Sequence, residues 1–327
     1  MVGCSLHPIA LTFSSAPILC SIAVLALLWP QASPANIIAG TRDRDGADPD
    51  GRASLLAVGP NFGLAAADIN RIRRSTGYVF CRPVGPDGQV HSLKGSGFLG
   101  ATGDLVITSA HELREAIAIG GEGALASCYF RPQDGSSDKV MFDPRGGSYF
   151  LGDAIGSGAQ GAVVDVALFS LAHPVQGAAP IPLAEAEPPA GTEILKISAS
   201  EADMGARVDY REPIAVLCQI REAFAGEPVT FSDGTAGIAP PGFYSDCDTK
   251  KQASGGASLA WIGAGAERRL EIVGLTVGTG DDKYDGAPFD PRHSHTYHLG
   301  VTNVLADFVG RLAQHQPVPP ALAGDAR

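Results

Sequence analysis

Three side chains in the sequence, His111, Asp165 and Ser254, have the chemical types and local surroundings that nucleophilic catalysis requires. Ser254 is followed directly by two glycines, and a nucleophilic serine needs such a tight turn so that substrate and backbone can come close. His111 ends the run LVITSAH (105–111), which is typical of a buried strand. An imidazole at the end of this strand can take a proton from a serine hydroxyl and pass it to a leaving group.

Asp165 interrupts an apolar run, AVVDVALFSL (162–171), and therefore needs a reason to be there. Burying a carboxylate is unfavourable by several kcal/mol unless the group is paired or hydrogen-bonded. A histidine meets this need, because the carboxylate fixes the imidazole tautomer and stabilises its charged form. The alternative is an aspartate at the edge of a turn.

Short apolar segments separated by glycine-rich turns position these residues. The stretch 95–111 contains a strand at 95–99, a turn at 100–104 and a second strand at 105–108. Further strands are expected at 78–81, 127–130, 140–142, 162–171, 193–197, 214–220, 270–278 and 297–301, and helices at 65–74, 112–119 and 303–312. The 327 residues include 41 Gly, 24 Pro and 18% charged residues, which favours an all-β enzyme over a helical bundle.

The N-terminus has the pattern of an export signal. Residues 1–35 carry no charged side chain, and the apolar run 17–30 is short for a transmembrane helix. We therefore expect a signal peptide cleaved after Ala35 and a secreted or periplasmic protein with no membrane contact afterwards. An uncleaved anchor is the alternative. The net charge of −11, with no basic run, argues against nucleic acid or an anionic membrane surface as a partner.

Several motifs together resemble those of the chymotrypsin-like (trypsin-fold) serine peptidases. The stretch 95–111 is similar to their histidine signature, DVAL (165–168) to their aspartate strand, and QASGGA (252–257) to their serine motif. The chain order His, Asp, Ser is the same. The run NIIAGTRDR (36–44) is similar to the mature start of the V8-like (glutamyl-endopeptidase-like) branch, with a flexible leader as the alternative.

This resemblance implies an all-β fold of two antiparallel β-barrels with a C-terminal helix. The expected organisation is a signal peptide (1–35), an N-terminal leader (36–76), a first barrel (77–173), a linker (174–190), a second barrel with the helix (191–312) and a Pro/Ala-rich tail (313–327).

It also implies an exported serine endopeptidase that acts on polypeptides through an acyl-enzyme and needs no cofactor. Ser254 would attack the scissile carbonyl, His111 would transfer the proton, and Asp165 would orient His111. The backbone N–H groups of Gln252 and Ser254 would form the oxyanion hole. Relatives carry glycine where Gln252 stands, so a flipped peptide there is a second expectation, and with it a catalytically impaired homologue that acts as a binding module. Ser258, which no glycine follows, is a rival nucleophile.

Other positions follow from the same resemblance. Ala253 lacks the carboxylate of zymogen-activated members, so we expect no trypsin-type activation switch. Asp248 stands where trypsin-like members select Lys or Arg, and Leu275 where glutamyl-specific members carry a histidine. The Thr276 hydroxyl is expected to support Asp165, and residues Thr276, Val277 and Gly278 to pair with an extended substrate.

Two groups of residues leave alternatives open. The histidines of the H-x-H-x-x-H pattern are expected to be loop and pocket residues, with a metal site as the alternative; they are His293, His295 and His298, near Asp281, Asp282 and Asp285. Four cysteines remain after the signal peptide, which predicts two disulfides in an exported chain. A zinc site is the alternative, but the sequence contains no C-x-x-C pair that would support it. Pairing within each implied barrel gives Cys81–Cys128 and Cys218–Cys247.

Overall fold

The computed structural model describes residues 36–37, 51–100, 102–136, 138–143, 149–151, 165–199, 211–224, 228–230, 236–238, 241–250, 252–279 and 287–300. The expected signal peptide (1–35), C-terminal helix (303–312) and tail (313–327) lie outside these residues. None of the helices among the described residues is long and apolar enough to cross a membrane.

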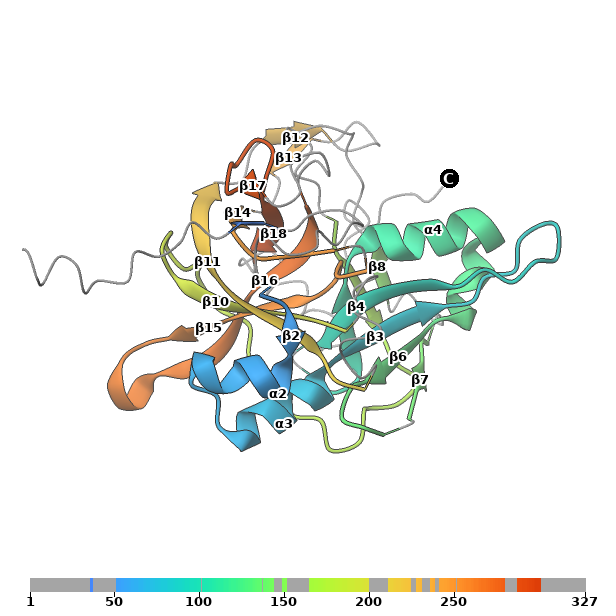
Figure 1. Ribbon diagram of the computed structural model, residues 1–327. Helices are drawn as coiled ribbons and strands as arrows, with labels where there is room; N and C mark the ends of the chain where they lie inside the picture. Colours follow the sequence, from blue (N-terminus) through green and yellow to red (C-terminus); the bar gives the residue numbers. More distant parts are fainter. Residues whose placement is uncertain are drawn as a thin grey trace, which may run out of the picture. The chain divides into compact units, whose positions relative to one another are not determined.

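Seven antiparallel strands form the first sheet, in the order β7-β6-β3-β4-β5-β9-β8 (Figure 1). They are β3 (Thr76–Cys81), β4 (Leu93–Leu99), β5 (Leu105–Thr108), β6 (Tyr129–Pro132), β7 (Val140–Met141), β8 (Tyr149–Leu151) and β9 (Ala167–Ser170). Helix α4 (Ala110–Gly120) follows β5, and the 3₁₀ helix η2 (Glu122–Ser127) leads toward β6. All four residues of β5 are buried, which accounts for its unbroken apolar sequence.

Six strands of the second sheet close into a barrel in the order β10-β15-β16-β18-β14-β11, because β10 pairs with both β15 and β11. They are β10 (Glu193–Ser198), β11 (Ile214–Phe224), β14 (Gly242–Ser245), β15 (Ala257–Ile262), β16 (Arg269–Thr279) and β18 (Thr296–Gly300). A short strand, β2 (Ala53–Ser54), pairs with β11 outside the ring. Remaining elements are the pairs β1 (Asn36–Ile37) with β17 (Ala287–Pro288) and β12 (Pro228–Thr230) with β13 (Ala236–Ile238), and the 3₁₀ helix η3 (Gly265–Glu267).

A single hydrophobic cluster contains residues of both sheets. Its fully buried members include Phe98, Ile107 and Leu168 of the first sheet and Leu195, Leu259 and Ile272 of the second. The linker expected at 174–190 runs beside β16, where Leu183 forms an isolated bridge with Ile272. The two sheets therefore share a core, and the all-β double-barrel expectation is confirmed, with a closed six-stranded barrel and a curled sheet.

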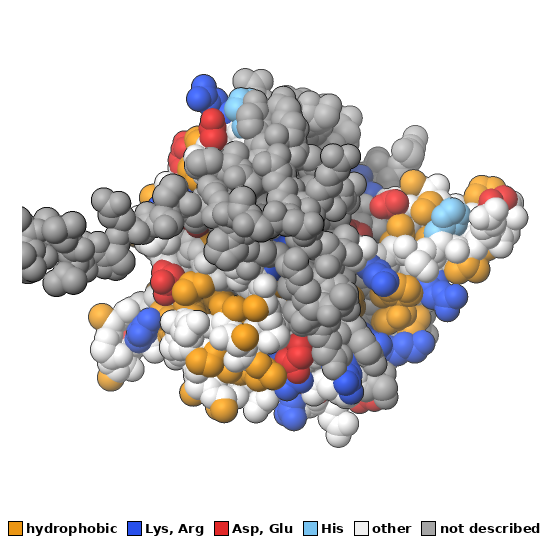
Figure 2. All heavy atoms as spheres, viewed as in Figure 1, with side chains coloured by type: hydrophobic (Ala, Val, Ile, Leu, Met, Phe, Trp, Pro, Cys, Tyr) orange, Lys and Arg blue, Asp and Glu red, His pale blue; other side chains and the backbone are white. Residues whose placement is uncertain are grey.

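The segment expected as a leader at 36–76 is part of the folded body over its described residues from 51 onward. It contains α2 (Leu55–Val58), η1 (Gly59–Phe62) and α3 (Ala66–Ser75), whose Leu55, Phe62, Ile69 and Ile72 are buried in the shared core. The apolar faces of these helices have a partner in the fold. Figure 2 shows hydrophobic side chains and both signs of charge interspersed on the described part of the visible face, and Leu56 of α2 is 51% exposed.

Both disulfides form within the expected halves. Cys81 at the end of β3 is bonded to Cys128 before β6, and Cys218 in β11 is bonded to Cys247 after β14. The second disulfide fixes the start of the loop that leads to Ser254, because Cys247 lies only seven residues before that serine. The predicted connectivity is confirmed.

Candidate active site

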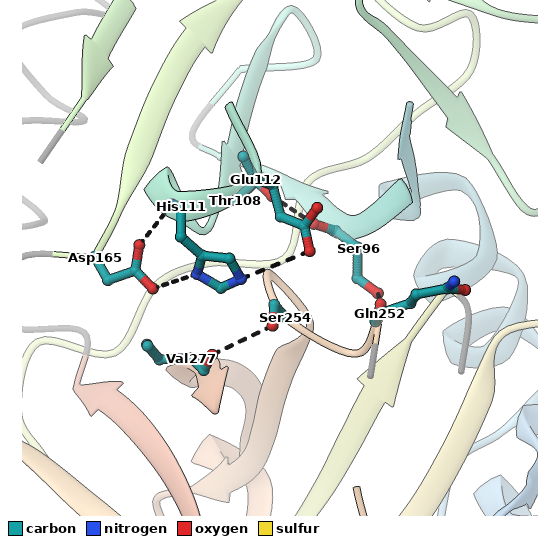
Figure 3. Close-up of polar contacts among 8 residues, drawn as sticks. All are labelled: Ser96, Thr108, His111, Glu112, Asp165, Gln252, Ser254 and Val277. Atoms are coloured by element: carbon teal, nitrogen blue, oxygen red, sulfur yellow. Dashed lines mark hydrogen bonds and ion pairs between the residues drawn. The ribbon is translucent and has the colours of Figure 1, made fainter. Parts of the chain in front are cut away.

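Asp165 holds His111 by two hydrogen bonds (Figure 3). The register of β5 against β9 pairs Thr108 with Ala167, which brings the residues just beyond the two strands together. The ring Nδ1 of His111 lies 2.6 Å from Oδ2 of Asp165, and the backbone N–H of His111 donates to Oδ1 at 2.8 Å. Asp165 is buried, and these two hydrogen bonds offset the unfavourable free energy of burying its carboxylate.

A second carboxylate lies on the opposite side of the His111 ring. Oε1 of Glu112, the next residue in α4, is 3.6 Å from Nε2 of His111. Burial lowers the pKa of His111, but the hydrogen bonds and charges of Asp165 and Glu112 raise it more, to about 10. The sequence drew no attention to Glu112, because a glutamate in the first turn of a helix is ordinary.

Ser254 lies in a turn in which the next residue, Gly255, can only be glycine. Gly255 has a φ of 84°, and a Cβ there would meet the Ser96 carbonyl oxygen at 1.9 Å and Thr108 Oγ1 at 2.4 Å. The Ser254 hydroxyl donates to the carbonyl of Val277 at 3.2 Å, and no hydrogen bond joins it to His111 in the described part of the chain (Figure 3). The half-buried serine thus lies beside the imidazole with its hydroxyl turned toward β16.

Ser96 of β4 connects the two halves of the site. Its backbone N–H donates to the carbonyl of Ser254 at 2.8 Å, and its hydroxyl donates to the carbonyl of Gln252 at 3.1 Å. The same hydroxyl accepts from the backbone N–H of Ala199, and Thr108 Oγ1 donates to the Ser96 carbonyl at 2.6 Å. The sequence singled out the Gly-Ser-Gly stretch but assigned Ser96 no role.

Gln252 has a left-handed backbone conformation of the kind that favours glycine. Its φ is 76°, and no other non-glycine residue among those described has a positive φ. The N–H of Ala253 donates to the Lys250 carbonyl at 3.2 Å, so a turn closes between these two residues, and Gln252 within it is left-handed. Holding a non-glycine residue there costs about 1–3 kcal/mol. The flipped peptide that the missing glycine suggested does not follow from this φ value, and the oxyanion hole stays a prediction.

Ser258, the rival nucleophile, is completely buried in β15. Its hydroxyl lies 2.9 Å from Nδ1 of His298, whose Nε2 lies 2.7 Å from the Ser245 hydroxyl. Burial lowers the pKa of His298 well below its ordinary value, and the charge of Lys196 lowers it further, so the ring is neutral. A serine enclosed in this way cannot reach a substrate, which leaves Ser254 as the candidate nucleophile.

The Thr276 expectation is wrong. We expected its hydroxyl to support Asp165, but the register of β16 against β18 pairs Thr276 with His298 and turns the hydroxyl into the second barrel. Thr276 Oγ1 lies 3.4 Å from Nδ1 of His298. Its backbone still supports the site, because the Gly255 N–H donates to the Thr276 carbonyl and the Thr276 N–H donates to the Gly256 carbonyl, both at 2.8 Å.

Asp248 is buried and has an internal partner. Its carboxylate accepts a hydrogen bond from the backbone N–H of Gly51 at 2.8 Å, and its carbonyl accepts one from Nζ of Lys196 at 2.8 Å. Lys196 Nζ also bonds Thr249 Oγ1 at 2.8 Å. These contacts show that Asp248 stabilises the loop before Ser254. Its expected role in substrate binding stays a prediction.

The three histidines of the H-x-H-x-x-H pattern do not point to one centre. His298 is enclosed by serine hydroxyls, and the His295 ring packs edge-on against Tyr244 at 4.5 Å between centroids. No group of three or more metal-ligating side chains is found among the described residues, from which Asp281, Asp282 and Asp285 are absent. His298 lies within β18, whereas His295 precedes the first residue of that strand.

No protein-family model matches the sequence, and no curated protein matches it either. Among solved structures, the chain is similar to the Rv3671c protease of M. tuberculosis in its active form, at 17% identity and a TM-score of 0.45, over 85% of this chain and 97% of that one. It is also similar to the scabies mite inactivated protease paralogue S-I1, at 11% identity and a TM-score of 0.48, over 76% and 98%. A third similar structure is the thermostable serine protease AL20 from an extremophilic microorganism, at 12% identity and a TM-score of 0.43, over 75% and 99%.

The strand order and the barrel closure described above define the chymotrypsin-like double barrel, a serine-protease fold. This assignment rests on the chain's own topology. The placement in the V8-like branch is not confirmed and stays a prediction.

Proposed function

We propose that the protein is an exported serine endopeptidase with Ser254 as nucleophile, His111 as general base and Asp165 as the group that orients it. The observation that carries this proposal is that Asp165 accepts two hydrogen bonds from His111, and that the His111 ring lies beside Ser254 in its glycine-containing turn. A protease fold and two disulfides fit a secreted or periplasmic enzyme that acts on polypeptides. No nucleic acid or membrane partner is part of the proposal.

The mechanism follows from what each group can do. His111 takes the Ser254 proton on Nε2 while the serine oxygen attacks the scissile carbonyl, and the proton then passes to the leaving amine. The acyl-enzyme is hydrolysed by water, which His111 activates in the same way. Asp165 keeps the other ring proton on Nδ1 and stabilises the imidazolium that forms at each step.

The turn at Gln252 supports an oxyanion hole made of backbone N–H groups. Two donors, Gln252 N–H and Ser254 N–H, would bind the oxygen that becomes negative in the tetrahedral intermediate. Gln252 has a left-handed φ, and the Ser96 hydroxyl donates to its carbonyl, which favours this conformation of the turn. Losing one such donor lowers the rate by about 10²–10³-fold.

An extended peptide would bind along β16 next to the nucleophile. Pairing of β16 with β15 ends at Leu275, whereas its pairing with β18 continues to Thr279. The edge at Val277 and Gly278 is therefore left without a strand partner from β15. A Cβ on Gly278 would meet no heavy atom within 4 Å, so a peptide can approach the backbone there.

Labelling with a fluorophosphonate probe tests the proposal. We expect the purified mature protein to be labelled, Ser254→Ala to abolish labelling, and the folded Ser258→Ala variant to keep it. A well-folded wild-type protein that takes up no probe would contradict the proposed activity and leave the protein as a binding module. Loss of labelling in Ser258→Ala with retention in Ser254→Ala would contradict the choice of nucleophile.

A further inference from the structure

Glu112 occupies the side of His111 that the proposed mechanism assigns to Ser254. Its Oε1 lies 3.6 Å from Nε2, the ring atom that must receive the serine proton, and its side chain is only 13% exposed. The Glu112 side chain covers Gly95 of β4, where an added Cβ would meet Glu112 Cγ at 3.0 Å. The Glu112 side chain thus contacts β4 at Gly95, which has no side chain, and its carboxylate points toward the His111 ring.

A carboxylate on each ring nitrogen favours one protonation state of His111. Asp165 accepts the hydrogen bond of a proton on Nδ1, and the negative charge of Glu112, 3.6 Å from Nε2, favours a second proton on that nitrogen. An imidazole with both protons is an imidazolium and cannot act as a base. The hydroxyl of Ser254 accordingly donates to Val277 and makes no bond to the ring among the described contacts.

We propose that Glu112 is a positioning residue that holds His111 in its protonated resting form, and that its carboxylate must leave Nε2 before Ser254 can pair with the ring. This inference rests on the proposed function. On leaving, the Nε2 proton goes to solvent, the Nδ1 proton stays on the Asp165 side, and Nε2 gains the free lone pair that accepts the serine proton.

Among the described residues, the titratable groups that act on His111 or on its partner Asp165 are Glu112, Asp165 and Tyr297. Glu112 belongs to α4, Asp165 precedes β9, and Tyr297 of β18 interacts electrostatically with Asp165. Burial raises the pKa of Tyr297 above its usual value, so its phenol is neutral and brings no competing charge. The raised pKa of His111 agrees with two carboxylates acting on one ring.

An NMR titration of the His111 ring tests the inference without using activity. It uses the Ser254→Ala protein with labelled histidines, and a His111→Gln variant assigns the signal. We expect Glu112→Gln to lower the His111 pKa by at least about one unit, since one of two charged partners is lost. The control is Glu115→Gln, which removes the same charge from an exposed position of the same helix and should leave the titration in place. An unchanged His111 pKa in Glu112→Gln would overturn the inference.

The pH dependence of fluorophosphonate labelling in the Ser254 protein gives a second readout. We expect the labelling midpoint of Glu112→Gln to move to lower pH, whereas that of Glu115→Gln stays with the wild type. A wild type that labels with the same midpoint as Glu112→Gln would overturn the inference. If the ring pKa shifts but no variant labels at any pH, the role of Glu112 stands and the proposed peptidase activity fails. If Glu112→Gln does not fold, Glu112→Asp, which shortens the side chain and retracts the carboxylate, is expected to lower the His111 pKa in the same direction.

Discussion

The backbone N–H of Ser96 donates to the carbonyl of Ser254 across 2.8 Å, so a strand of the first sheet is bonded directly to the candidate nucleophile of the second. The Ser96 hydroxyl adds a bond to Gln252 at the other end of the same turn. These bonds set where the serine turn lies relative to His111, which follows the next strand of the first sheet. Alignment of base and nucleophile therefore depends on one residue that touches neither reacting atom.

Ser96→Ala is expected to weaken both stability and labelling. It leaves the Ser96 backbone bond in place but removes the hydroxyl partner of the Gln252 carbonyl and of the Ala199 N–H. Leaving buried groups without partners costs about 1–3 kcal/mol. Urea unfolding measures the stability loss, and fluorophosphonate uptake measures the rate. Ser109→Ala is the matched control, because that buried hydroxyl has no hydrogen-bond partner among the described residues. Equal losses in the two variants would contradict the role given to Ser96.

Gly255→Ala is expected to abolish labelling and to destabilise the fold by more than about 2 kcal/mol. The new Cβ would collide with the Ser96 carbonyl oxygen, which the surrounding strand holds in place. Thermal unfolding and probe labelling are the measurements. In Gly88→Ala the backbone strain is similar, with a φ of 77°, but the Cβ meets nothing within 4 Å. We expect that control to lose about 1 kcal/mol and keep its labelling. A labelled, stable Gly255→Ala protein would show that the turn can move away from β4.

Gln252→Gly is expected to stabilise the protein by about 1 kcal/mol, because the strain that glycine relieves at a φ of 76° exceeds the extra conformational entropy that glycine loses on folding. Labelling should be at least as fast as in the wild type, since the oxyanion turn keeps its conformation. The β-branched variant Gln252→Val should lose both stability and labelling, because such residues are strongly disfavoured at positive φ. The unfolding midpoints and labelling rates of the glycine and valine variants, each compared with the wild type, test this prediction. Faster labelling in the valine variant would argue against a left-handed turn in the working enzyme.

The His111 pKa predicts how stability changes with pH. A folded-state pKa of about 10 lies above the ordinary value of 6.5, so the folded protein binds this proton more tightly than the unfolded chain. The stabilisation is fully present below pH 6.5 and is lost as the pH rises through about 10. The side chain is 42% exposed, so added salt should weaken the effect. Urea unfolding from pH 6 to pH 10 should show a falling stability that His111→Gln flattens. The same slope in both proteins would contradict the prediction.

Some parts of the site could be predicted from the sequence because they follow local rules. Asp165 stands out as a charge in an apolar strand, and strand pairing then brings it to His111. The glycines after Ser254 predict a turn, and the φ of 84° at Gly255 is one that favours glycine. The even number of cysteines predicts two disulfides but leaves three connectivities open, and the pairing found was predicted only from the two barrels that the family resemblance implies.

Other parts depend on contacts between distant residues and carry no local signal. The Thr276 hydroxyl faces His298 because of a register in β16 and β18 that includes an irregularity between residues 276 and 278. Glu112 of helix α4 reaches the ring because Gly95 of strand β4 leaves room for its side chain. The segment from Leu55 to Ile72 buries its apolar side chains against both sheets, although its sequence resembles a leader as well as a packed element.

The two disulfides should separate stability from activity. They close loops of 47 and 29 residues, so the chain-entropy model gives about 4 kcal/mol of stabilisation for Cys81–Cys128 and about 3.6 kcal/mol for Cys218–Cys247. Replacing either pair by serine should lower the free energy of unfolding by amounts of this order, measured in urea. Only the Cys218/Cys247 variant should also slow fluorophosphonate labelling of the folded protein, because Cys247 anchors the loop that carries Asp248 and leads to Ser254. If the Cys81/Cys128 variant slowed labelling to the same degree, the loop would be held by the overall fold and not by its own disulfide.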